Sequence, residues 1–340
     1  MNSIRGVPMN RRGFTLLEML VVIALVGLLA GLVLPSLSKG RARSQGVACA
    51  AHLRELGRGW SAYCDENDDI MVPHRIPAVG GTITDPSYYA EVGNGKKYKP
   101  RWAAMLAGAL DLKAFDKPDP LNDRQDYDHD VLKCPAELTW VDARNAPFGY
   151  NYQFLGNSRD KSGVFHNYPL KRHRVKALSR TVVAGDCMGT AAGFPIAARS
   201  GYSNDATDFN DPGNHAYTLD PPRLTAGSDR GDSGQGRTAV DPRHLNRANV
   251  VFADGHAENL SDRELGYRKR PNGRYVDLDP DDPAGDSFNP TTGSLVGPRP
   301  PKNRGARGFG YSQTPGGVVD PTSNHYFSGT GNDDNPPNIP

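Results

Sequence analysis

The stretch RRGFTLLEMLVVIALVGLLAGLVLPSL, residues 11–37, decides how this chain begins to fold. A short basic leader ends at Gly13, and an apolar run follows from residue 14 to residue 34, interrupted by the single charge of Glu18. A run of about 20 apolar residues can cross a hydrocarbon core as a helix. A carboxylate in such a run is costly in lipid, which indicates that Glu18 has a function.

This segment resembles the prepilin leader of type IV pilins and type II secretion pseudopilins. The resemblance rests on the basic leader, the Gly13-Phe14 pair, Glu18 at the fifth place after the glycine, and Pro35. It implies that a prepilin peptidase cuts between Gly13 and Phe14 and that the new amine of Phe14 is methylated. It also implies that Glu18 is neutralised on assembly by the methylated Phe14 amine of a neighbouring subunit.

Two other interpretations compete. A secretory signal is cut after its apolar stretch at small residues, but here the run continues into PSLSKG without an A-x-A-like site. A plain membrane anchor has no need for Glu18.

Arginines in the leader favour a cytoplasmic N-terminus, which predicts a single-pass inner-membrane protein. Its C-terminal domain is then periplasmic, or extracellular after assembly.

Composition bounds the rest of the chain. A net charge of +2 over 340 residues gives no electrostatic basis for binding nucleic acid. With 38 glycines and 28 prolines, we expect a loop-rich domain with a modest core. We predict a leader, a membrane or filament-core helix, an amphipathic helical extension, a globular pilin-like domain, and a Pro/Gly-rich tail, at residues 1–13, 14–35, 36–66, 67–267 and 268–340.

An apolar stripe predicts that the helix continues beyond the membrane segment. Cys49, Leu53, Leu56, Trp60 and Tyr63 recur at steps of four, three, four and three. This spacing is typical of one helix face packed on a domain. The predicted fold is therefore α+β, with a long N-terminal transmembrane-plus-amphipathic helix packed on a small antiparallel sheet and followed by a disordered tail.

Strand signals are short, and the clearest is a hairpin. Residues 248–253 and 256–260 are strand-like and flank Asp254-Gly255, which favours a type I′ turn. Residues 181–184 are a further strand signal, and Asp186 just after them is interpreted as a turn residue. The tail has almost no apolar periodicity, so we expect it to add little stability.

His244, followed by nine residues and then Asp254-Gly255, resembles the H-x(9)-D-G element of large pilin-like proteins associated with prepilin-type processing. Further segments carry the same resemblance, namely CAAHLRELGRGWSAYCDEN, KCPAE, FGYNYQ, TVVAGD and RHLNRANVVFADGHAENL. The resemblance implies that the chain is a pilin-like protein, but it does not imply any enzymatic reaction. The structural interpretation is that Asp254-Gly255 makes the turn and His244 bonds backbone near it. The alternative is an envelope enzyme using His244 and Asp254 as a general-base pair, although no nucleophile lies in this local sequence.

Four cysteines in an exported domain predict two disulfides. Three connectivities are possible; Cys49–Cys134 with Cys64–Cys187 would pin the amphipathic helix to the domain at two heights. The alternative is four buried thiols. No C-x-x-C occurs, and no spacing of cysteine and histidine resembles a zinc site.

Asp277, Asp279 and Asp281 alternate as in a calcium loop and are the candidate calcium ligands. The sixth position is Asp282 in place of glycine, and the twelfth is Phe288 in place of glutamate. A second acidic loop carries Asp205, Asp208 and Asp211. Both loops are more typical of solvated acidic turns, so no cofactor is expected.

The sequence therefore predicts a structural subunit and not an enzyme. Its partners would be prepilin peptidase, the inner membrane, and other pilin or pseudopilin subunits. A type IV pilus and a type II secretion pseudopilus both fit. A pilin-processed surface protein that binds carbohydrate or an envelope partner is the alternative, since the Pro/Gly tail and the acidic loop suit such a role.

Overall fold

The computed structural model describes residues 15–74, 86–120, 125–136, 147–156, 158–159, 165–166, 171–199, 217–222, 238–267, 269, 273, 275 and 326–327. The chain divides into two compact units, Met1–Ser44 and Gln45–Pro340. Helix α1 (Leu16–Glu66) contributes residues to both units.

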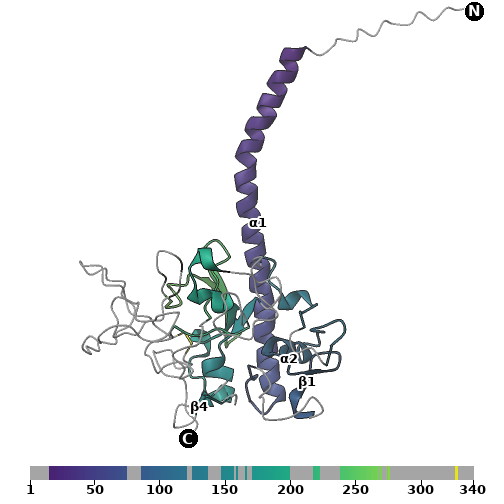
Figure 1. Ribbon diagram of the computed structural model, residues 1–340, viewed down its shortest axis with the longest axis vertical. Coiled ribbons are helices and arrows are strands. Elements are labelled where there is room, and N and C mark those ends of the chain that lie inside the picture. Colours follow the sequence, from purple (N-terminus) through teal and green to yellow (C-terminus); the bar gives the residue numbers. More distant parts are fainter. Residues whose placement is uncertain are drawn as a thin grey trace, which may run out of the picture. The chain divides into compact units, whose positions relative to one another are not determined.

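Helix α1 is continuous, as the sequence predicted (Figure 1). Pro35 lies inside it, and because proline has no backbone N–H, one helical hydrogen bond is missing there. The Ser38 hydroxyl donates to the Pro35 carbonyl at 2.9 Å. Among the described residues, α1 is the one helix long and apolar enough to span a membrane.

The second part of α1 buries the predicted stripe. Its buried residues are Cys49, Leu53, Leu56, Gly57, Gly59, Trp60 and Cys64. A β-carbon on Gly57 would lie 2.6 Å from Val251 Cγ2, and one on Gly59 would lie 2.8 Å from Leu110 Cδ1. These two glycines therefore permit a close approach of neighbouring elements, at the expense of helix propensity.

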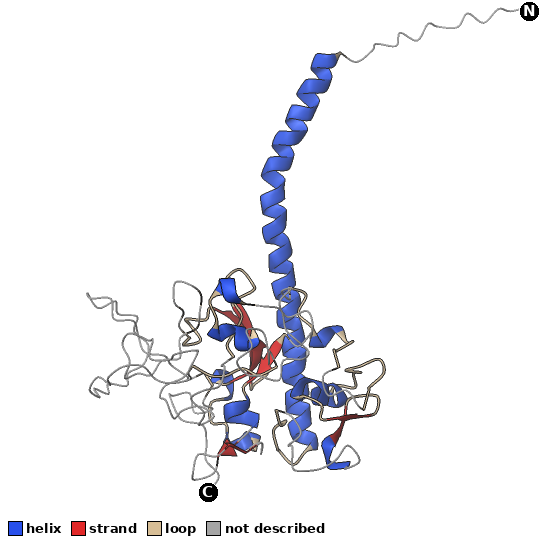
Figure 2. Ribbon diagram, in the orientation of Figure 1, coloured by secondary structure: helices blue, strands red, loops and turns tan. Residues whose placement is uncertain are grey.

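The globular unit contains a four-stranded antiparallel sheet in the order β3-β6-β7-β8. Its strands are β3 (Phe148–Tyr150), β6 (Val182–Asp186), β7 (Ala248–Phe252) and β8 (Ala257–Leu260). Strands are drawn in red in Figure 2. Every residue of the first three strands is buried, whereas the edge strand β8 is half-buried or exposed. The small antiparallel sheet of the predicted fold class is confirmed.

The predicted β7–β8 hairpin is present, but its loop differs from the expected type I′ turn. The Gly255 N–H donates to the Phe252 carbonyl at 2.9 Å, and Phe252 N–H donates to the His256 carbonyl at 2.8 Å. Gly255 has φ of +90°, while Asp254 has no positive φ. A type I′ turn needs positive φ at both central residues, so this is a three-residue loop ending in a left-handed glycine.

The remaining elements are short. They include one further α-helix, α2 (Trp102–Ala109), and two antiparallel strand pairs, β1 (Tyr89–Glu91) with β2 (Lys96–Tyr98) and β4 (Ser158–Arg159) with β5 (Phe165–His166). Single-turn helices are η1 (Pro86–Tyr88), η2 (Asp130–Leu132), η4 (Tyr152–Gly156), η5 (Arg172–Arg174), η6 (Leu178–Arg180), η7 (Gly189–Gly193) and η8 (Ile196–Ala198). This high share of irregular chain agrees with the glycine and proline content.

Short parts of the chain beyond Tyr267 lie in the core, which the sequence did not predict. Tyr275 and Phe327 are buried among the core residues, and Tyr326 packs against that core. The Tyr326 carbonyl accepts a hydrogen bond from the Val182 N–H of β6 at 2.6 Å. The absence of apolar periodicity was therefore no guide to burial here, because aromatic contacts formed over a long sequence separation leave no local periodicity.

Candidate functional site

The start of α1 is built by a reciprocal cap between Thr15 and Glu18. Glu18 Oε2 accepts hydrogen bonds from the Thr15 N–H at 2.7 Å and from the Thr15 hydroxyl at 2.9 Å. The Glu18 N–H in turn donates to Thr15 Oγ1 at 3.2 Å. This is a capping box, which satisfies backbone donors that the first helical turn leaves open. Glu18 therefore caps the first turn of α1, in addition to the role in subunit assembly that the resemblance implies.

After this cap, α1 exposes a continuous apolar surface. The exposed large apolar residues are Leu16, Leu17, Met19, Leu20, Val21, Val22, Ile23, Leu25, Val26, Leu28, Leu29, Leu32, Val33, Leu34 and Leu37. Such a surface marks a membrane or protein contact, since water alone would leave it unfavourably solvated. Gly13 and Phe14, the predicted processing residues, lie outside the described residues.

A second candidate site is a buried cluster of Cys49, Cys134, Asp186 and His244. Their ligand atoms all lie within 4.8 Å of one another. The Cys49 thiol donates to Asp186 Oδ1 at 3.1 Å, and His244 Nε2 lies 3.3 Å from Asp186 Oδ2 and 3.5 Å from Cys134 Sγ. We call these four residues the Cys-Asp-His cluster.

Each member comes from a different element. Cys49 lies on the buried stripe of α1, Cys134 follows η2, and Asp186 ends strand β6, where it is paired with Phe148 of β3. His244 occupies a tight turn just before β7. In that turn, backbone hydrogen bonds run both ways between His244 and Arg247, at 3.0 and 3.2 Å.

Leu245 and Asn246, the central residues of this turn, have φ of +55° and +64°. Non-glycine residues rarely adopt this region, so the turn is held by its surroundings and fixes the direction of the histidine ring. The H-x(9)-D-G element is thus one strand with a shaped turn at each end. His244 bonds side chains of the cluster with its ring, which corrects the expectation of a backbone contact near the hairpin.

Asp186 was interpreted as a turn residue, and this was wrong. It is the last residue of β6 and is fully buried. Its Oδ2 accepts a hydrogen bond from the Asn249 N–H of β7 at 2.6 Å. The tight pairing of β6 with β7 therefore aims this carboxylate into the protein, because adjacent strands present backbone donors at their shared edge.

Electrostatics couple the sulfur and imidazole groups. Hydrogen bonding from Cys49 lowers the pKa of the Cys134 thiol to about 5, with burial opposing and His244 assisting. Burial raises the pKa of the Cys49 thiol far above its ordinary value. Burial lowers the pKa of His244, but hydrogen bonds to Asp186 and Cys134 outweigh it and raise that pKa to about 9. The cluster therefore favours a thiolate beside an imidazolium.

A thiolate, an imidazole and a carboxylate in contact also form the arrangement of a nucleophile, its base and an orienting group. In this cluster the exposed fractions are 0% for Cys49, 3% for Cys134, 0% for Asp186 and 5% for His244. A nucleophile this deeply enclosed presents no face to a substrate. The set can hold an ion or a proton, and it is not arranged for attack on a substrate.

The pair His244 and Asp254, considered from the sequence as an acid–base pair, is not brought together. Asp254 Oδ1 instead contacts Nδ1 of the half-buried His256 and accepts from its backbone N–H. The His256 ring stacks on Phe252 with centroids 4.3 Å apart. Asp254 therefore belongs to the hairpin loop and not to the buried cluster.

All four cysteines are free thiols, so the two predicted disulfides are not present in the structure. Cys49 and Cys134 do lie together, in the cluster. Cys64 and Cys187 have other surroundings: the Cys187 thiol donates to the Thr218 carbonyl at 2.9 Å. Burial, opposed by nearby Arg172, raises the pKa of the Cys64 thiol to about 12.

The candidate calcium ligands Asp277, Asp279 and Asp281 lie outside the described residues, and so do Asp205, Asp208 and Asp211. The donors that the structure does bring together escaped sequence reasoning because they are far apart along the chain. An even number of cysteines and one histidine in a named motif were the available signals, but neither indicates which carboxylate joins them.

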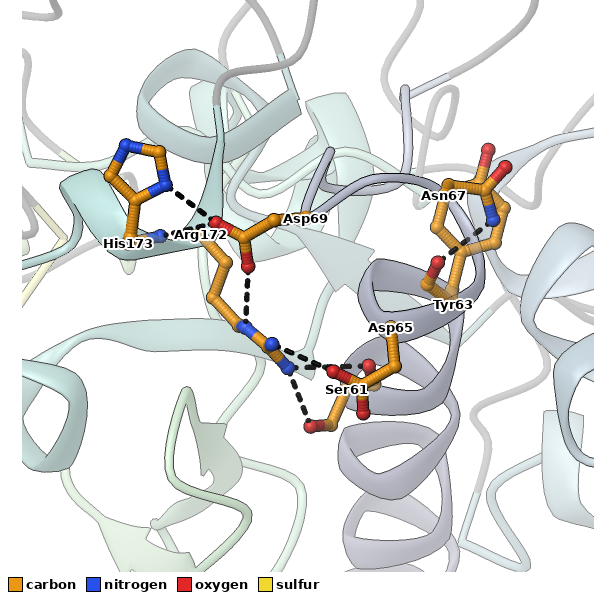
Figure 3. A network of polar contacts seen from close by, with 7 residues as sticks. All are labelled: Ser61, Tyr63, Asp65, Asn67, Asp69, Arg172 and His173. Atoms are coloured by element: carbon orange, nitrogen blue, oxygen red, sulfur yellow. Dashed lines mark hydrogen bonds and ion pairs between the residues drawn. The ribbon is translucent and has the colours of Figure 1, made fainter.

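A polar network near the end of α1 holds that helix to η5 (Figure 3). Arg172 donates from Nη2 to Asp65 Oδ1 at 2.7 Å, from Nε to Asp69 Oδ1 at 3.0 Å, and from Nη1 to Ser61 Oγ at 3.1 Å. Asp69 Oδ2 accepts from the His173 N–H at 3.0 Å and lies 2.7 Å from Nδ1 of its ring. Arg172 and Asp69 thus join the end of α1, the segment just after it, and η5.

This network predicts a pH-dependent contribution to stability. Hydrogen bonds from the backbone N–H and the ring of His173, together with Arg172, lower the pKa of Asp69. A lowered carboxyl pKa stabilises the fold above the ordinary value of about 3.9, and this is lost as the pH falls through the folded-state pKa. Asp69→Asn should therefore lower Tm at neutral pH, and the difference from the natural chain should shrink as the pH falls below about 4.

Melting curves from neutral pH to about pH 3 check this. Asp68→Asn is the matched control, because both positions have positive φ, at 53° and 66°, and asparagine tolerates it. A pH-independent loss in Asp69→Asn, or an equal loss in the control, would contradict the assignment.

Comparison with known proteins concerns the N-terminal part of the chain. A family model described as "Prokaryotic N-terminal methylation motif" matches residues 8–34. The type IV major pilin protein PilA of Myxococcus xanthus is 36% identical over 61 residues, which cover 18% of this chain and 27% of that protein. The type IV wide pilus major component PilA4 of Thermus thermophilus is 34% identical over 59 residues, 17% of this chain and 45% of that protein.

The matched region is therefore less than half the length of either relative. No solved structure matches the chain.

Proposed function

We propose that this chain, which carries a prokaryotic N-terminal methylation motif and is similar to type IV major pilins over its N-terminal part, is a pilin- or pseudopilin-like structural subunit. A prepilin peptidase cuts between Gly13 and Phe14 and methylates the new amine of Phe14. The apolar part of α1 then passes from the inner membrane into the core of an envelope filament or secretion pseudopilus, and the globular unit stays outside it.

The observation that carries this proposal is the coincidence of the motif with the exposed apolar surface of α1. The motif covers residues 8–34, and the large apolar side chains from Leu16 to Leu37 are exposed in the single chain. Burying one such side chain contributes about 1.5–3 kcal/mol, so the segment needs lipid or other helices around it. A membrane pool and a bundle of identical helices both supply that environment.

Glu18 has two candidate roles that the structure allows to be separated. It completes the cap with Thr15, and its charge is available to the methylated amine of Phe14 on a neighbouring subunit. A buried carboxylate without a partner is destabilising, so such pairing would fix the axial register between subunits. A glutamine at this position retains the cap, because a capping box accepts Glu or Gln, but it carries no charge.

Three variants of the full chain test assembly. Glu18→Gln should be processed and inserted yet fail to enter filaments or crosslinked multimers, and Glu18→Ala should behave likewise. Thr15→Val removes the hydroxyl of the cap and keeps the charge, so it should still assemble. The measurements are mobility of the processed chain and recovery of crosslinked multimers from membranes. Normal multimers from Glu18→Gln would contradict charge pairing; failure of Thr15→Val alone would assign Glu18 to capping only.

A further inference from the structure

We propose that Cys49, Cys134, Asp186 and His244 form a binding site for one Zn²⁺ ion, which ties helix α1 to the sheet. The proposal rests on the globular unit alone and is independent of the assembly proposed above. It gives the histidine of the H-x(9)-D-G element a chemical role as a metal ligand.

The donor set suits zinc. Two thiol sulfurs, one imidazole nitrogen and one carboxylate oxygen give four ligands of the kinds that Zn²⁺ takes in tetrahedral protein sites. Calcium and magnesium bind through oxygen ligands and would be poorly served by two sulfurs. The mixture of sulfur and nitrogen donors therefore selects a borderline-soft ion.

The distances suit the same geometry. With zinc–ligand bonds of roughly 2.0–2.3 Å, the ligand atoms of a tetrahedron lie roughly 3.3–3.8 Å apart. In the cluster, the separations are 3.1 Å for Cys49 Sγ to Asp186 Oδ1, 3.3 Å for His244 Nε2 to Asp186 Oδ2, and 3.5 Å for His244 Nε2 to Cys134 Sγ. The four ligand atoms lie within 4.8 Å of one another, and the two contacts to Asp186 involve different carboxylate oxygens, so zinc binding would draw the most distant pair together by up to about 1 Å.

Surrounding groups hold the ligands in place. The Asn249 N–H donates to Asp186 Oδ2, and the Asn249 side chain donates to the Gly46 carbonyl of α1 at 3.0 Å. Asn259 of β8 donates to Asn249 Oδ1 at 2.9 Å. Such outer hydrogen bonds orient ligands at metal sites, and here they connect the helix, β7 and β8 around the cluster.

The ligand charges are compatible with a divalent cation. On zinc binding both thiols would be deprotonated, so two thiolates and a carboxylate would place three negative charges in a site that is almost closed to water. The guanidinium of Arg243 is nearby and buried, but it also faces Asp241, with Nε 2.9 Å from Oδ2. A divalent ion compensates the ligand charges directly, and buried charges without such compensation are strongly destabilising.

A zinc ion here would also explain how a loop-rich domain is held together. The ligands come from α1, the chain after η2, the end of β6 and the turn before β7. Metal binding that joins distant segments contributes its free energy to folding, and closing long loops gains most from such a link. The site is enclosed, as structural zinc sites are, with no open position for a reacting water.

The test uses the full chain, purified in detergent without chelator and with its thiols kept reduced. We expect about one zinc per chain by elemental mass spectrometry, retained after desalting. Cys134→Ser should reduce bound zinc at least tenfold. Cys64→Ser is the matched control, because Cys64 is equally buried and lies outside the cluster, and it should retain zinc.

A measurement on the natural chain covers the case in which Cys134→Ser does not fold. After chelation, added Co²⁺ should give the intense thiolate-to-cobalt absorption of a tetrahedral sulfur site, and Zn²⁺ should displace it. Chains that take up neither ion would overturn the proposal. So would recovery of a Cys49–Cys134 disulfide in peptides from chain isolated without reductant, or equal zinc in Cys134→Ser and the natural chain.

Discussion

Replacing Phe327 with alanine should lower the free energy of unfolding by about 3–5 kcal/mol. Phe327 is fully buried, and its ring meets that of Tyr267 edge to face with centroids 5.8 Å apart. Its carbonyl accepts a hydrogen bond from Asn151 Nδ2 at 2.9 Å, and the preceding Tyr326 carbonyl accepts from Val182. Tyr326 and Phe327 therefore pack in the core beside β6.

Chemical denaturation of the full chain in detergent, followed by near-ultraviolet circular dichroism, measures this effect. Leu178→Ala is the control, because Leu178 is 39% exposed and should cost much less. A chain ending at Tyr267 should be destabilised at least as much as Phe327→Ala, since it also lacks Tyr275. If truncation leaves the transition unchanged, the segment beyond Tyr267 does not complete the fold.

Trp60→Ala is the second change with a large expected effect, again about 3–5 kcal/mol of unfolding free energy. Trp60 lies on the buried stripe of α1, and its indole N–H donates to the Tyr150 hydroxyl at 3.3 Å. Tyr150 is itself fully buried and stacks on Trp102 with centroids 5.2 Å apart. Alanine would leave a cavity and a buried hydroxyl without its donor, and both effects destabilise the fold.

Arg58→Ala provides the comparison on the same helix. Arg58 is exposed, and its ion pair with Glu55 is of the surface type that contributes about 0–1 kcal/mol. Far-ultraviolet circular dichroism during denaturation avoids reliance on tryptophan fluorescence. Equal destabilisation by the two variants would mean that α1 is not docked through its apolar stripe.

Three contacts along the second part of α1 define how it is held in the globular unit. Cys49 enters the Cys-Asp-His cluster, Trp60 enters the aromatic core, and Asp65 pairs with Arg172. They differ in chemistry: the first joins thiols, an imidazole and a carboxylate, the second is an aromatic contact, and the third is an ion pair. All three residues lie in the globular unit, so these contacts give the second part of α1 a defined face toward the rest of that unit.

Local patterns in the sequence predicted the elements whose reasons are local. The apolar run and Glu18 indicated a membrane-type helix, the stripe from Cys49 to Trp60 indicated its buried face, and Asp254-Gly255 marked a hairpin. The turn type was wrong because only Gly255 has positive φ. A dipeptide predicts that a turn occurs, whereas the flanking register decides whether two or three residues form its loop.

The contacts that depend on distant segments could not be predicted in this way. Asp186 looks like a turn residue beside Gly185, but pairing with β3 and β7 buries it. Cys134 and His244 are 110 residues apart in the sequence, and their side chains meet only in the folded structure. Phe327 sits in a segment without periodicity and is buried through contacts with residues far along the chain. Each of these positions is decided by tertiary packing, for which one sequence carries no periodic signal.

The central claim is that this chain is processed as a prepilin before assembly, and intact mass measurement of membrane-extracted chain tests it most directly. Expressed with a prepilin peptidase, the chain should lose residues 1–13 and begin at Phe14 bearing one added methyl group. Without the peptidase it should retain the leader, and Gly13 replaced by a bulky residue should prevent the cut. A mature chain that still begins at Met1 in the presence of the peptidase, or that begins beyond residue 34, would contradict the account.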